Sequence, residues 1–161
     1  FPPLYDENSR VLILGSFPSV KSREQMFFYG HPQNRFWRVL AAVFASETPQ
    51  TIAEKRRFLL SHGIALWDVI ASCEITGSAD SSIKNVIAND LSPILAAADI
   101  RQIFVNGKTA EKFYRKYTEP VIGRAAICLP STSPANAAWS LERLIAAWQH
   151  VREAMRADSD I

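Results

Sequence analysis

Short apolar runs alternate along this chain with longer amphipathic stretches. Helical spacing of apolar residues marks the stretches 34–44, 51–62, 92–95, 107–117 and 141–151. The short apolar runs are nearly continuous, as in strands buried on both faces, and cover residues 11–14, 64–69, 103–105 and 126–129. Strands that alternate with helices predict a parallel sheet covered on both sides. We therefore expect an α/β fold, a three-layer α/β/α sandwich with a central four-stranded parallel sheet, formed as one domain by residues 1–161.

The pattern also makes predictions outside the sheet. A glycine- and proline-punctuated loop is expected to follow the first strand up to Pro32, and the serine-rich stretch 71–89 also predicts a loop. In the helix over residues 51–62, the inward positions are expected to be Ile52, Leu59 and Leu60.

Composition narrows the class of protein without giving its function. The chain has 161 residues, of which 48% are hydrophobic and 21% charged, as in ordinary globular domains. The net charge of +2 identifies no partner, so nucleic acid would have to bind through a local patch. No apolar run approaches the roughly 18 residues of a membrane span, and residues 1–10 do not resemble a signal peptide. We expect a cytoplasmic protein that does not associate with membranes.

Several common kinds of site are excluded by spacing. The two cysteines, Cys73 and Cys128, are too few for a disulfide scaffold or a four-cysteine iron–sulfur cluster. No histidine or cysteine pair has the spacing of metal ligands, and we expect no metal and no cofactor. His62 and His150 are interpreted as exposed residues on helices. No Gly-x-Ser-x-Gly elbow occurs, which disfavours a small-molecule α/β hydrolase.

Two weaker signals were weighed in the same way. Residues 107–109 (Gly-Lys-Thr) resemble the end of a phosphate-binding P-loop, but the pattern needs a glycine where the chain has Gln102. We therefore interpret residues 106–109 as a tight turn with helix-capping residues. Paired carboxylates for glycosidase chemistry are missing, because the loop after the first strand has only Glu24 and the loop after the fourth has no acid. Asp68, at the end of the second strand, is the one carboxylate that the topology places well, and a structural role is equally compatible with it.

Two loops stand out at the ends of predicted strands. The first covers residues 15–19 and continues through 28–37, and the second covers 131–136. Both offer backbone amides and small hydroxyls, which can hold phosphate oxygens without a large net charge. The first adds aromatic rings suited to stacking on a base. Core packing and helix capping explain each residue singly, but their coincidence at two neighbouring strand ends favours nucleic-acid binding.

The sequence of these loops resembles the uracil-DNA glycosylase superfamily, and within it the hypoxanthine-DNA (deoxyinosine) glycosylase family, its sixth family. The resemblance is carried by the first motif at 12–19, the Asn-Arg-Phe-Trp block at 30–37 and the second motif at 129–136. Residues 65–69 and 81–85 add to it. The resemblance implies an enzyme of DNA base-excision repair that extrudes a damaged base from the duplex and needs no cofactor.

The resemblance also implies a role for individual residues. Many superfamily members have Asp or Asn at the position of Phe17 and His at the position of Ser131. In the sixth family Asn34 looks to fill the vacancy, and it is expected to orient a water molecule against the anomeric carbon. Base-binding residues are expected to be Ser16, Phe17, Tyr29 and Asp68. The DNA backbone is expected to be clamped, and the vacated space filled, by Ser131, Ser133, Pro134, Ala135 and Asn136.

Some choices stay open at this point. Phe17 is expected to stack on the base, and either Ala135 or Asn136 to press into the vacated space. Asp68 could accept from a base N–H or fix a donor that does so. Further contacts to the backbone are expected from the nearby basic residues Lys21, Arg23, Arg35 and Arg38.

The expected activity is hydrolysis of the N-glycosidic bond of a deaminated base in DNA, with hypoxanthine as the base and an abasic site as product. The partner is then DNA, and the protein is expected to act as a monomer. Two alternatives remain: a glycosylase for uracil or thymine in mismatches, and a non-catalytic module that binds damaged DNA.

Overall fold

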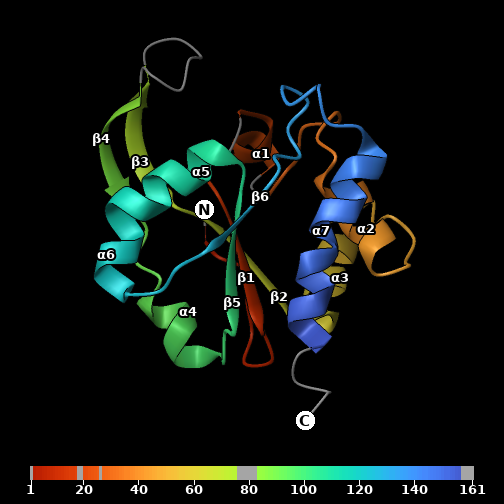
Figure 1. The fold of residues 1–161 in the computed structure, drawn as a ribbon, viewed down its shortest axis with the longest axis horizontal. Coiled ribbons are helices and arrows are strands. Elements are labelled where there is room, and N and C mark those ends of the chain that lie inside the picture. Colours follow the sequence, from red (N-terminus) through yellow and green to blue (C-terminus); the bar gives the residue numbers. More distant parts are fainter. Residues whose placement is uncertain (1, 18–19, 26, 76–82, 157–161) are drawn as a thin grey trace.

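A computed structural model describes residues 2–17, 20–25, 27–75 and 83–156. Its centre is a parallel sheet of four strands in the order β2-β1-β5-β6 (Figure 1). The strands are β1 (Val11–Gly15), β2 (Ile64–Asp68), β5 (Gln102–Asn106) and β6 (Ile127–Leu129). These are the four strands that the hydrophobic pattern predicts, shifted by two residues at most. The α/β prediction with a central four-stranded parallel sheet is therefore confirmed.

Burial on both faces explains why β1 is uniformly apolar. Val11 and Ile13 belong to one hydrophobic core, and Leu12 and Leu14 to a second core on the other face. The first core is covered by α2 (Phe36–Val43), α3 (Ile52–Ser61) and α7 (Leu141–Arg156). The second is covered by α4 (Ser92–Ala97) and α5 (Lys108–Phe113). Figure 1 shows these two helical layers on opposite sides of the sheet.

The prediction of a loop over residues 71–89 is wrong. This stretch contains β3 (Ile70–Ile75) and β4 (Ile83–Ala88), which pair as an antiparallel hairpin separate from the main sheet. Its polar composition has a physical reason, because Ser72 and Asn85 are exposed. Neighbouring residues, such as Ala71 with Ser72 and Lys84 with Asn85, are exposed together, so the sequence lacks the alternation that marks a half-buried strand. Residues 81 and 82, part of the family resemblance, lie outside the described residues.

The loop expected between the first strand and Pro32 contains a short helix, α1 (Val20–Gln25). Pro18 and Ser19, the end of the first motif, lie outside the part of the chain that the structure describes. The segment 107–117, predicted as one helix, is also more complex than expected. After α5 the chain continues through a π-helical turn, η2 (Tyr114–Thr118), and then α6 (Glu119–Ile122).

Two side-chain predictions in the layer of helices over the first core need correction. Ile52 is not inward, since it is 43% exposed on the first turn of α3, and Phe58 is buried in its place. His62 is not an exposed helical residue, because it ends α3 half-buried with its ring tilted against Phe44 and its Nδ1 atom 2.8 Å from the Phe58 carbonyl oxygen. His150 is exposed, as predicted, and lies 3.2 Å from Glu153.

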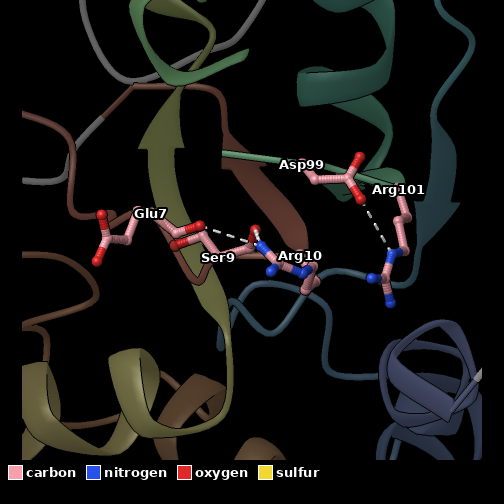
Figure 2. Close-up of polar contacts among 5 residues, drawn as sticks. All are labelled: Glu7, Ser9, Arg10, Asp99 and Arg101. Atoms are coloured by element: carbon pink, nitrogen blue, oxygen red, sulfur yellow. Dashed lines mark hydrogen bonds and ion pairs between the residues drawn. The ribbon is translucent and has the colours of Figure 1, made fainter. Parts of the chain in front are cut away.

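The amino-terminal ends of the strands are closed by polar contacts of their own (Figure 2). Arg10, just before β1, donates hydrogen bonds to the carbonyl oxygens of Glu7 and Ser9. Arg101, just before β5, pairs with Asp99 at 3.5 Å. Arg10, Asp99 and Arg101 at this edge are thus occupied by local partners, whereas the carboxyl edge of the sheet carries the cavity described next.

Candidate active site

A cavity of about 290 Å³ opens at the carboxyl ends of the central strands. Gly15, Asp68 and Asn106, the last residues of β1, β2 and β5, form part of its wall. The segment before α2 and the loop after β6 supply the rest of the wall. The volume lies just below the usual range for ligand pockets, about 300–1,000 Å³. Its size suits one planar base better than a whole nucleotide.

Most of the predicted site residues meet at this cavity. The predicted site residues that line it are Ser16, Phe17, Tyr29, Asn34, Asp68, Ser131, Ser133 and Pro134. Ala135 and Asn136 do not line it. They border an adjoining groove of about 750 Å³, which shares Ser16, Ser131 and Ser133 with the cavity.

Asn34 is held by a chain of hydrogen bonds that begins on β5. The Asn106 Nδ2 group donates to the Thr132 hydroxyl at 3.0 Å, and that hydroxyl donates to Asn34 Oδ1 at 2.9 Å. The backbone N–H of Phe36 donates to the same Asn34 oxygen at 3.0 Å. Because an amide oxygen has two lone pairs, both acceptor positions are used. The Nδ2 group is therefore the polar atom that Asn34 keeps for the cavity.

Two residues of this series of hydrogen bonds, Asn106 and Thr132, are not among the site residues that the sequence predicts. Asn106 was interpreted as part of a turn, and Thr132 received no role within the second motif. Thr132 is fully buried, and its backbone N–H donates to Asn106 Oδ1 at 3.1 Å, so the two side chains lock each other. The sequence could have indicated Asn106 as a site residue, because it is a polar residue that directly follows a buried strand at the edge of the sheet where ligands bind.

The loop after β6 is braced in part by its own side chains. The Ser131 hydroxyl accepts from the Ser133 N–H, and the Ser133 hydroxyl accepts from the Ala135 N–H. A hydroxyl that accepts keeps its own hydrogen, so both serines can still donate to a phosphate oxygen. The Asn136 side chain donates back to the Ser131 carbonyl oxygen at 3.0 Å, while Pro134 and Ala135 are exposed.

Arg35 was expected to contact the DNA backbone, but its side chain points into the protein. Its guanidinium donates to the carbonyl oxygens of Ser133 at 3.0 Å, Asn136 at 3.1 Å and Trp139. It therefore holds the second loop from inside. Of the other basic residues, Arg38 is exposed on α2 and Arg23 lies with its guanidinium 5.5 Å from the centre of the Phe17 ring. The side chain of Lys21 lies outside the described part of the structure.

Asp68 and Tyr29 converge above Gly15. A Cβ atom at Gly15 would lie 2.5 Å from Asp68 Oδ1 and 3.1 Å from the Tyr29 hydroxyl, so both groups reach the space that only glycine leaves open. Asp68 is 7% exposed, and this burial raises its pKa from 3.8 to about 7. The buried Tyr29 hydroxyl makes no hydrogen bond of normal geometry to any described residue.

The position of Tyr29 is fixed by its backbone and its ring. Its φ of 52° lies in the left-handed region, which is unfavourable for a side chain of this size. The ring stacks on Phe36 with the two centroids 4.0 Å apart. Burial, with the charge of Asp68 as a second cause, raises the pKa of the Tyr29 hydroxyl above its ordinary value, so this group stays protonated as a donor.

The described residues contain neither a metal-binding cluster nor a membrane-spanning helix. No group of three His, Cys, Asp or Glu side chains there is arranged to hold a metal ion. None of the described helices is long and apolar enough to cross a membrane.

The family model for the uracil DNA glycosylase superfamily matches residues 2–152. The chain belongs to this superfamily. The membership confirms the resemblance drawn from the two loops and agrees with the cavity lying between them.

Individual relatives within the superfamily are similar over most of their length. A hypoxanthine DNA glycosylase from Methanosarcina acetivorans is 36% identical over 148 residues, which cover 89% of this chain and 90% of the relative. A hypoxanthine DNA glycosylase from Methanosarcina barkeri is 34% identical over 142 residues, covering 84% and 86%. The solution NMR structure of a Methanosarcina acetivorans protein, provisionally assigned as a uracil DNA glycosylase, superimposes with a TM-score of 0.78 at 32% identity, over 94% of this chain and 96% of that one.

Proposed function

We propose that this member of the uracil DNA glycosylase superfamily hydrolyses the N-glycosidic bond of deaminated bases in DNA, with hypoxanthine as its principal base. The names and the 34–36% identity of the two hypoxanthine DNA glycosylases support the choice of base. The observation that carries the proposal is the Asn34 carboxamide, held by Thr132 and Phe36 at a base-sized cavity between two serine-bearing loops.

A base inside a duplex is out of reach, so the target nucleotide must leave the stack and enter the cavity. In the proposed complex the hydroxyls of Ser131 and Ser133 donate to flanking phosphates. Phe17 stacks on the extruded base. Ala135 is the better candidate for the residue that fills the vacated space, because it is exposed, whereas the Asn136 side chain is bonded within its own loop.

Asn34 acts on the nucleophile by positioning it. A neutral carboxamide is no base, and its oxygen is already used by Thr132 and Phe36. The proposed role is donation from Nδ2 to one lone pair of a water molecule, which leaves the other lone pair directed at the anomeric carbon. As the bond to the base breaks, the sugar becomes strongly electrophilic, and a well-placed water needs little further activation.

The reaction consumes only water, and the proposal requires no cofactor and no metal. We also propose that the protein acts as a monomer. We place the protein in the cytoplasm.

A panel of duplexes tests the proposed function. Each duplex carries one hypoxanthine, uracil, xanthine or mismatched thymine, and is treated with alkali after incubation so that abasic sites become strand breaks. We expect breakage at hypoxanthine. Breakage only at uracil or thymine would establish the mismatch-directed alternative, and retarded migration of the duplex without breakage would establish a non-catalytic binder.

A further inference from the structure

We propose that Asp68 is a catalytic residue that donates its proton to the departing purine, with the Tyr29 hydroxyl as a second donor to the same base. This inference rests on the proposed function. It assigns to Asp68 a chemical step that a group serving only to recognise the base would not perform.

The first argument is the position of the carboxyl group. Asp68 ends β2 and pairs with Gly15 in the sheet register, so its side chain leaves the sheet where the cavity begins. Its backbone is fixed, because its carbonyl oxygen accepts from Asn89 Nδ2 at 2.8 Å and the following residue bonds back to Gly15. The carboxyl group is therefore held on a rigid element against the floor of the cavity.

The second argument is the absence of a structural partner. Among the described residues, no cation forms an ion pair with Asp68, and none forms a hydrogen bond with its carboxyl group. The Tyr29 hydroxyl beside it is buried and makes no hydrogen bond of normal geometry, although the Asn106 side chain lies close enough to lower its pKa. Buried polar groups in proteins are nearly always satisfied, so a carboxyl group without a partner beside an incompletely bonded hydroxyl marks a place for a ligand.

The surroundings of Asp68 favour its neutral form. Tyr29 and His31 line the same cavity, and Arg23 lines a smaller one of about 160 Å³ that Asp68 also borders. Burial raises the pKa of Asp68 to about 7. Near neutral pH a large fraction of the molecules then carries a carboxylic acid here, which is the form that can act as a general acid.

The chemistry uses a feature that purines have and pyrimidines lack. In the proposed step the Asp68 O–H gives its proton to N7 of hypoxanthine while the bond between C1′ and N9 breaks and its electron pair moves into the ring. Hypoxanthine leaves as a neutral molecule, and Asp68 becomes a carboxylate. Water adds to C1′ and loses one proton, which restores the acid. The Tyr29 hydroxyl donates to O6 and so helps to draw electrons away from N9.

A two-by-two comparison tests this step. Wild-type protein and Asp68→Asn are each given duplexes with hypoxanthine or with 7-deazahypoxanthine, which has carbon in place of N7. Single-turnover rates are measured from pH 5.5 to pH 9. On hypoxanthine we expect Asp68→Asn to be slower by about 10²-fold at pH 6, the usual size of a general-acid contribution. On the 7-deaza base the substitution should have no effect, because no proton acceptor remains at that position.

The pH profile gives an independent readout. The wild-type rate on hypoxanthine should fall about tenfold per pH unit above the pKa of Asp68, and the Asp68→Asn rate should be flat. Asp99→Asn, at the opposite end of the strands, is the matched control and should behave as wild type. The wild-type comparison of the two bases, with its loss of pH dependence on the 7-deaza base, stands even if Asp68→Asn does not fold.

The outcomes separate this inference from the proposed function. Equal slowing of both bases by Asp68→Asn, or an unchanged pH profile in that variant, would overturn the proton-donor role and leave the glycosylase intact. The same holds if wild-type protein keeps its pH dependence on 7-deazahypoxanthine. Failure of wild-type protein to break any duplex would overturn the proposed function and this inference with it.

Discussion

At the scale of single residues, the account depends on side chains that hold other side chains. Asn34 cannot rotate freely, because Thr132 donates to its oxygen while Asn106 donates to Thr132. Sequence reasoning singled out Asn34 through the Asn-Arg-Phe-Trp block. The two residues behind it escaped notice, since their importance depends on a contact between residues 98 positions apart, which no local pattern records.

Thr132→Val tests this arrangement, because valine keeps the shape of threonine and removes the hydroxyl. Asn34 then loses one of its two fixed bonds, and a buried Asn106 donor is left unpaired. We expect base cleavage to slow by about tenfold and the free energy of unfolding to fall by about 1–3 kcal/mol. Single-turnover assays and urea denaturation measure the two effects. Thr132→Ser keeps the hydroxyl and should restore both, and a valine variant with wild-type rates would show that the chain of bonds is dispensable.

Asp68 also predicts how stability changes with pH. In the folded protein it keeps its proton up to about pH 7, whereas in the unfolded chain it loses the proton near its ordinary pKa of 3.8. Between these values the folded state binds more protons, so the contribution of Asp68 to stability is lost as pH rises through that range. Raising the pH from 5 to 8 should lower the free energy of unfolding of wild type more than that of Asp68→Asn. The difference between the two drops should be on the order of a few kcal/mol. Urea denaturation at both values measures this, and equal pH dependence in the two proteins would contradict it.

At the scale of elements, hydrophobic periodicity was sufficient for the elements that pack on the two main cores. The four strands of the main sheet and the helices over both faces follow from it. The hairpin of β3 and β4 does not, because neighbouring residues on both strands are exposed and the stretch therefore resembles a loop. The role of Arg35 was also out of reach, since its neighbours in the sequence say nothing about the loop 98 to 104 residues away that it holds.

Arg35 therefore matters for the shape of the loop after β6. Lysine keeps the charge but cannot donate in several fixed directions, so Arg35→Lys should lose two of the three bonds to carbonyl oxygens. We expect faster amide hydrogen exchange over residues 131–139 and weaker binding to DNA. Arg38→Lys is the matched control on the exposed side of α2, and it should leave exchange in that loop unchanged. Equal exchange in the loop of Arg35→Lys and wild type would show that the loop needs no such brace.

At the scale of the whole molecule, the parallel sheet brings the ends of its strands to one edge, and the loops that follow make one cavity there. A net charge of +2 means that DNA must be held by a few local contacts instead of by a general positive field. The sequence predicted this edge correctly from the rule for open α/β sheets. The burial of Asp68 and the incomplete hydrogen bonding of the Tyr29 hydroxyl could not be predicted from the sequence, because both depend on the three-dimensional arrangement.

The salt dependence of DNA binding reports how many of these local contacts are made to phosphates. If exposed Arg38 contacts a phosphate, Arg38→Ala should reduce the slope of log affinity against log salt concentration by about 1. Fluorescence anisotropy with a hypoxanthine duplex, titrated at several salt concentrations, measures the slope. An unchanged slope would place Arg38 outside the DNA contact.

The central claim is that the Asn34 carboxamide positions the attacking water. Single-turnover cleavage of a hypoxanthine duplex by Asn34→Ala tests it most directly, with Asn8→Ala at the opposite edge of the sheet as the control. We expect Asn34→Ala to be slower by about 10²-fold or more, as for the loss of one preorganised group, and Asn8→Ala to match wild type. Cleavage by a folded Asn34→Ala at the wild-type rate would contradict the account.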